Sequence, residues 1–144
     1  MKGQVKLLIA IIILGGAFAA GANAQTSSSQ TLRARIPFAF MVGDKMLPAG
    51  VYTVSILNPS SDRKALQIRS ENGRVSAIVQ TTGVEGTPGG NAKLVFRRYG
   101  QSFFFAKAQM AGETTSLAAS RTRAERATKR AIKQTGSSTE VAAF

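Results

Sequence analysis

An alternation of side chains begins at Leu32 and ends at Val42, and it places six apolar residues on one face of an extended chain. A period of two is typical of a β-strand with one buried face, so we predict a half-buried strand here. Pro37 has no N–H group to donate within a sheet, which favours an edge strand or a bulged one. The six apolar residues are Leu32, Ala34, Ile36, Phe38, Phe40 and Val42.

Five further short segments are rich in β-branched or aromatic residues and are separated by turn residues. Asn72-Gly73, between two of them, is the strongest hairpin signal in the chain, because this pair suits a tight two-residue turn. We therefore predict a mainly β fold, a six-stranded antiparallel meander that closes as a small barrel or sandwich. The five segments are 51–57, 65–70, 74–80, 93–99 and 102–110, with a Gly-rich loop at 81–91. The predicted core comprises Ile36, Phe38, Phe40, Tyr52, Val54, Ile56, Leu66, Ile68, Leu94, Phe96, Phe104 and Ala106.

The pattern changes after Gly112, where alanines and basic residues replace the alternation. Thr122-Arg-Ala-Glu125 matches the capping box that begins many helices, and Gly136 is suited to end one. We predict a C-terminal α-helix within a basic tail, residues 113–136, followed by a disordered C-terminus, residues 137–144. The apolar stripe of this helix consists of small residues, so we expect the helix to pack weakly on the β-domain. The stripe comprises Ala124, Ala127 and Ala131.

The first 24 residues have the three parts of a secretory signal in order: two lysines, an apolar run from Leu7 to Phe18, and Ala22-Asn23-Ala24 before a new N-terminus at Gln25. The alternative is an uncleaved membrane anchor, but the apolar run is short of the roughly 20 residues that cross a bilayer. We therefore predict a signal peptide at 1–24, a polar spacer at 25–31 and a β-domain at 32–112. The expected location is periplasmic or extracellular, with no transmembrane segment after cleavage.

Charge is the most unusual property of the chain. Its 144 residues include 19 Lys plus Arg against 7 Asp plus Glu, a formal net charge of +12, and loss of the signal lysines leaves +10. There is no Cys and no His, which excludes disulfides, metal sites built from those residues and His-dependent catalytic triads. Outside the cytoplasm the abundant polyanions are lipid phosphates and anionic polysaccharides, so nucleic acid is the minor option.

Three patterns resemble parts of enzyme sites, and each lacks its partners. Ser61-Asp-Arg-Lys64 matches S-x-x-K, but it falls in a predicted turn and no K-T-G or S-D-N follows. The glycines at 83–90 lack the Lys and the following helix of a phosphate-binding loop. The seven acids of the mature chain are scattered, which disfavours a catalytic carboxylate pair or a calcium loop. We predict a protein that is not an enzyme and that has no cofactor and no metal.

The basic residues are the main candidates for a binding site. They predict a structural or adhesive module held to anionic envelope material, that is, anionic polysaccharide or lipid headgroups. The alternative is that these charges only solubilise the protein and protect strand edges. The candidate polyanion-binding residues are Arg33, Arg35, Arg97, Arg98, Arg121, Arg123, Arg126, Lys129, Arg130 and Lys133.

The aromatic run Phe103-Phe104-Phe105 raises a second function, that of a small-ligand carrier whose barrel interior is lined by aromatic rings and accepts a lipid-like molecule. Alternation places Phe104 on one face of its strand and the other two rings on the opposite face. The competing interpretation is that both faces of this strand are packed, one of them against the C-terminal helix.

Two motifs together resemble an uncharacterised family of small exported bacterial β-proteins. The first is Ile36-Pro-Phe-Ala-Phe-Met-Val-Gly43 followed by Leu47-Pro-Ala-Gly-Val-Tyr-Thr-Val54, and the second is Lys93-Leu-Val-Phe-Arg-Arg-Tyr-Gly100 followed by the Phe run. The resemblance extends to Arg126 and implies an exported β-domain, and it carries over no information about activity or mechanism. Members of this family carry an acidic residue where this chain has Ala39 and Val51, so this chain is the more basic one at both places.

Overall fold

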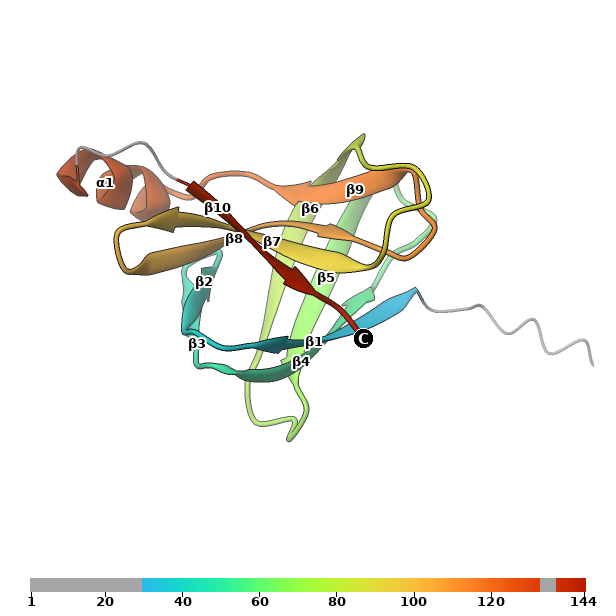
Figure 1. Ribbon diagram of the computed structural model, residues 1–144, viewed down its shortest axis with the longest axis horizontal. Coiled ribbons are helices and arrows are strands. Elements are labelled where there is room, and N and C mark those ends of the chain that lie inside the picture. Colours follow the sequence, from blue (N-terminus) through green and yellow to red (C-terminus); the bar gives the residue numbers. More distant parts are fainter. Residues whose placement is uncertain (1–29, 133–136) are drawn as a thin grey trace, which may run out of the picture.

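Ten strands and one helix form the structure, a computed structural model that describes residues 30–132 and 137–144 (Figure 1). The predicted signal peptide and most of the predicted spacer lie outside the described residues. The elements are β1 (Thr31–Ile36), β2 (Phe40–Val42), β3 (Lys45–Leu47), β4 (Gly50–Ile56), β5 (Arg63–Ser70), β6 (Ser76–Glu85), β7 (Lys93–Tyr99), β8 (Ser102–Gln109), β9 (Thr115–Ala119), α1 (Arg123–Ile132) and β10 (Ser137–Ala142).

All ten strands belong to one sheet, whose main path runs β1-β4-β5-β6-β9-β8-β2-β3. Strand β8 also pairs with β7, which in turn pairs with β10, so the sheet branches at β8. The pairs are antiparallel except for β2 with β8, which run parallel at Met41 and Phe104. The mainly β prediction is confirmed, but the six-stranded closed barrel is wrong: the sheet has more strands, branches, and does not close.

The predicted strand at 32–42 is divided in two, and Pro37 is the reason. β1 pairs with β4 over its whole length, from Thr31 with Ser55 to Ile36 with Gly50. After the proline, which cannot continue that ladder, the chain turns away and β2 pairs instead with β3 and β8. Gly43, with φ near +60°, makes the turn between β2 and β3, a backbone conformation that glycine adopts readily.

Three further segments differ from the prediction, and two of them pair with each other. The segment predicted to be a Gly-rich loop instead extends β6 to Glu85, because it pairs with β9 from Thr81 with Ala119 to Glu85 with Thr115. β9 itself occupies part of the predicted helical tail. The predicted disordered C-terminus forms β10, which pairs with β7, for example Val141 with Leu94.

Of the predicted core, Phe38 is only partly buried and Phe104 and Ala106 are buried outside the main cluster, while the other nine residues belong to that core. Aromatic rings fill its centre: Phe40 contacts Tyr52 and Phe96 edge-on, both with ring centroids 5.2 Å apart. Phe96 also contacts Phe105 at 6.1 Å. Such edge-to-face contacts add to the stabilisation that burial alone provides.

The predicted alternation along the Phe run is also confirmed. Phe105 lies in the core, and Phe103 stacks on Phe38 at the same face with ring centroids 3.8 Å apart. Phe104 lies on the opposite face beside Tyr99, at 5.9 Å. Both rings of this second pair are buried, because α1 covers that face of β7 and β8 (Figure 1). Both faces of the hairpin are therefore packed.

Candidate polyanion-binding surface

Helix α1 begins with half of the predicted capping box. The Thr122 hydroxyl accepts a hydrogen bond from the Glu125 N–H at 3.1 Å, which satisfies one of the free N–H groups at a helix start. In a full capping box the Glu side chain would return to the N–H of the capping residue. Here the Glu125 side chain reaches across to the sheet instead.

Glu125 is the anchor of the helix. Its side chain is 2% exposed, and both carboxylate oxygens accept from Arg97 on β7, at 2.5 Å from Nε and 3.0 Å from the guanidinium NH2. The Tyr99 hydroxyl donates to the same carboxylate at 3.1 Å, and Arg121 lies at 3.8 Å. A buried carboxylate needs such partners, because removing a charge from water is expensive unless it is paired and hydrogen-bonded. We call Glu125, Arg97 and Tyr99 the clamp.

The helix packs through a different face from the predicted one. Glu125 is buried and Thr128 and Ile132 are partly buried, a spacing of three and four that marks one side of a helix. The expected alanine stripe is exposed. The alanine prediction is wrong because an ion pair reaching to the sheet outweighs the small area that alanine side chains can bury. The exposed alanines are Ala124, Ala127 and Ala131.

Sequence reasoning missed the clamp, although one signal for it exists. Glu125 is the only acid among the basic residues of its segment. An isolated acid within a basic helix can pair with exposed basic neighbours on the same helix or with a basic residue of another element. The sequence pattern is the same in both cases.

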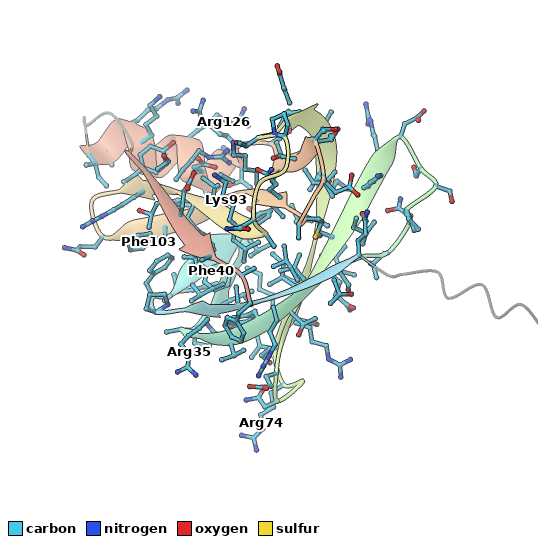
Figure 2. All side chains as sticks on the ribbon, turned by 45° about the vertical axis from the view of Figure 1, so that its right-hand side comes forward. Arg35, Phe40, Arg74, Lys93, Phe103 and Arg126 are labelled. Atoms are coloured by element: carbon cyan, nitrogen blue, oxygen red, sulfur yellow. The ribbon has the colours of Figure 1, made fainter. Side chains whose placement is uncertain are left out.

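With its acid facing the sheet, α1 presents basic side chains outward. Arg123, Arg126 and Arg130 lie at positions i, i+3 and i+7, which share one side of a helix. These three residues and Lys129 are exposed and form no salt bridge among the residues that the structure describes. We call these four residues the helix basic surface. Arg126, one of these four residues, is labelled in Figure 2.

Three of the other candidate residues already contact groups within the protein. Arg97 is only 19% exposed and belongs to the clamp, so it is not a surface ligand. Arg33 pairs with Glu71 and lies over the Phe144 ring at 5.2 Å. Arg98 donates to the Gly100 carbonyl at 2.8 Å and lies over an aromatic ring of β8.

Three more candidates complete this comparison. Arg35 is exposed on β1, far from α1 in Figure 2. Arg121 lies beside the clamp at the start of the helix. Lys133 lies outside the described residues. The structure therefore brings four of the ten candidates together on α1 and places the other five described candidates outside that set.

A groove of about 240 Å³ runs between α1 and the β2–β3 hairpin. Phe104 and Ser102 of β8, Ala124 and Thr128 of α1, and Met46 contribute to its wall. Met46 is 66% exposed, so the rim of the groove carries a large apolar side chain in contact with solvent. The volume is small for a ligand pocket, which usually measures a few hundred Å³ or more.

The other sequence motifs do not form a catalytic or metal site within the described residues. Ser61 lies in a turn, where its N–H donates to the Asn58 carbonyl, while Lys64 is already in β5. Among residues 30–132 and 137–144 no three acidic, His or Cys side chains are grouped as metal ligands would be. Burial raises the pKa of Tyr52, whose hydroxyl donates to the Pro48 carbonyl at 2.6 Å, but this residue is in the core, not at the candidate surface.

Comparison of the chain with protein-family models, curated proteins and solved structures returned no match. Within the described part of the chain, no helix has the length and apolar character that crossing a membrane requires.

Proposed function

We propose that this protein is an exported, non-enzymatic binding module that attaches to anionic envelope polymers through the helix basic surface. One observation carries the proposal: the single acid of α1 is turned into the sheet and neutralised by Arg97, so every exposed charged side chain of the helix is basic. The predicted signal peptide and the family resemblance support the exported location.

The chemistry of the surface favours carboxylate or phosphate partners. Three of its four residues are arginines, and a guanidinium can hold two oxygens of one acid group at once. Exposed charges contribute little individually, but several on one surface bind a polyanion cooperatively and release its counterions. Binding is therefore expected to weaken steeply as salt screens these charges.

The test uses residues 25–144 on immobilised polygalacturonate, eluted with a salt gradient. Deleting the C-terminal segment is not a usable control, because β9 and β10 are part of the sheet. Instead, Arg126→Gln/Arg130→Gln removes two charges from the helix basic surface. The matched control, Arg63→Gln/Lys64→Gln, removes the same charge from the start of β5.

Early elution of the helix variant, with the control eluting like wild type, supports the proposal. Equal elution of the two variants would show that only net charge matters and would overturn the assignment to α1. Failure of wild type to be retained at low salt would overturn polyanion binding itself.

A second candidate function, a small-ligand carrier, is favoured by the groove beside α1. The predicted aromatic interior is occupied by rings that contact one another, so a ligand would have to use the groove, whose wall includes Phe104 and Met46. Native mass spectrometry of the purified protein tests this candidate. A co-purifying mass that disappears in Ala124→Phe, which fills the groove from the helix side, supports it, and apo protein alone contradicts it.

A further inference from the structure

A second set of basic side chains lies on the outer face of β1, β4 and β5. Residues paired across an antiparallel sheet share a face, and the register joins Arg33 to Thr53 and Thr53 to Arg69 in one row. Arg35 lies two residues along β1 from Arg33 and so shares that face. Arg74 is exposed at the tip of the β5–β6 hairpin. We call Arg33, Arg35, Arg69 and Arg74 the sheet basic surface.

This surface keeps free charge. Arg33 is paired with Glu71, but Arg35, Arg69 and Arg74 form no salt bridge among the residues that the structure describes. All four are exposed. Arginines in one row but two strands apart are separated by about 10 Å, since neighbouring strands lie roughly 4.8 Å apart. The arginines can therefore contact separate acid groups along one polymer.

The two basic surfaces lie apart from each other. Figure 1 shows α1 at the upper left and the tip of the β5–β6 hairpin at the bottom. In Figure 2, Arg126 is at the top, and Arg35 and Arg74 are at the bottom. A single flat or linear partner that covers α1 therefore leaves the sheet basic surface free.

We propose that the protein is bivalent and bridges two anionic polysaccharide chains, one at each basic surface. This inference rests on the proposed function and adds to it a second site and a consequence, cross-linking. Two sites on one rigid domain convert separate weak contacts into a network, whose strength exceeds that of either contact alone.

The residues around the arginines favour a polysaccharide over a lipid surface. Thr31, Thr53 and Ser55 lie on the same outer face and offer hydroxyl groups to a sugar chain. Surface helices that enter a lipid interface carry large apolar residues such as Trp, Phe or Leu, whereas the exposed apolar residues of α1 are alanines.

The experiment separates binding from bridging. Residues 25–144 are mixed with soluble polygalacturonate, and light scattering reports cross-linked particles while retention on the immobilised polymer reports binding. The test variant is Arg35→Gln/Arg74→Gln, and the matched control is again Arg63→Gln/Lys64→Gln. All four substitutions are at side chains open to solvent or partly so, and thermal unfolding confirms that each variant is folded.

We expect wild type and control to scatter strongly in low salt and the test variant to scatter at least about tenfold less, while still being retained through α1. Scattering by the test variant equal to wild type would overturn bivalency within one chain. Such scattering is expected if two associated copies of the protein each bind one polymer chain through α1. Retention without scattering by wild type would overturn bridging but leave the proposed function intact.

Loss of both signals in wild type would overturn the proposed function as well. A last arm replaces the polymer with vesicles of phosphatidylglycerol and phosphatidylcholine. Aggregation of these vesicles in the absence of any effect on polygalacturonate would overturn the choice of polysaccharide as the partner.

Discussion

The two faces of the β7–β8 hairpin are covered in opposite ways. On the inner face Phe96 and Phe105 are surrounded by other rings and aliphatic side chains, with many weak contacts and no charge. On the outer face α1 is held by the Glu125 carboxylate, which accepts hydrogen bonds from Arg97 and Tyr99. The inner face distributes its stabilisation over many atoms, whereas the outer face concentrates it in three side chains.

Because of this difference, the two faces are expected to respond differently to substitution. An apolar core tolerates exchanges that preserve volume, because no single atom is essential. A buried ion pair tolerates the loss of both partners better than the loss of one, because a remaining charge is left without compensation. Substitutions on the two faces test this contrast.

Phe96→Ala is expected to lower the free energy of unfolding by about 3–5 kcal/mol, because it leaves a cavity among the central rings. Phe96→Leu, which keeps most of the volume, should lower it by about 1.5 kcal/mol or less. Urea unfolding followed by circular dichroism measures both. Equal losses for the two variants would show that ring contacts, not volume, determine stability at this place.

Glu125→Ala is expected to lower the free energy of unfolding by about 3 kcal/mol, near the low end for a broken buried pair because Arg97 keeps some contact with water. Hydrogen exchange should show faster exchange in α1 than in β4 or β5, since the clamp is lost while the inner core is intact. Unchanged protection of α1 would mean that Thr128 and Ile132 hold the helix without the clamp.

Replacing both partners, Arg97→Met/Glu125→Leu, is expected to restore most of that loss and to bring stability within about 1 kcal/mol of wild type. The apolar pair keeps the volume between α1 and β7 without leaving a charge. Comparison of both single variants with the double variant in one thermodynamic cycle gives the coupling energy. A double variant as unstable as Glu125→Ala would contradict the contrast drawn between the two faces.

Tyr52 gives the smallest effect, on the inner face. Because burial raises the pKa of this hydroxyl, the folded protein keeps the proton to a higher pH than the unfolded chain does. Its contribution to stability is therefore complete below about pH 10 and falls as pH rises above that value. Tyr52→Phe should weaken this alkaline loss of stability in urea titrations, and an identical pH profile would contradict the assignment.

The sequence predicted the regular, locally encoded parts of the fold well. Alternation identified β1 and β8 and the opposite faces of Phe103 and Phe104, because the side-chain period of a strand is a local property. It missed β9, which pairs with its neighbour β8 and with the more distant β6, and it missed β10, whose partner β7 is far away in sequence. Val141 pairs with Leu94, and no pattern near either residue reveals that contact.

The binding surface was predictable in composition but not in arrangement. Charge counting found the basic residues of α1, and Arg123, Arg126 and Arg130 do share one side of the helix. It also included Arg97, which neutralises Glu125, because a count cannot tell a charge that is used inside the protein from one offered to a partner. Arg69 joined the second surface only through the register of the sheet, and Arg74 only through its place at the tip of the β5–β6 hairpin.

Helix α1 is an insertion between two strands of one sheet, β9 and β10, rather than a free tail. Anchoring at both ends limits how far the helix can travel when the clamp opens, so its local concentration near β7 stays high and redocking is an intramolecular step. The helix can therefore leave the sheet and dock again without unfolding the strands on either side of it.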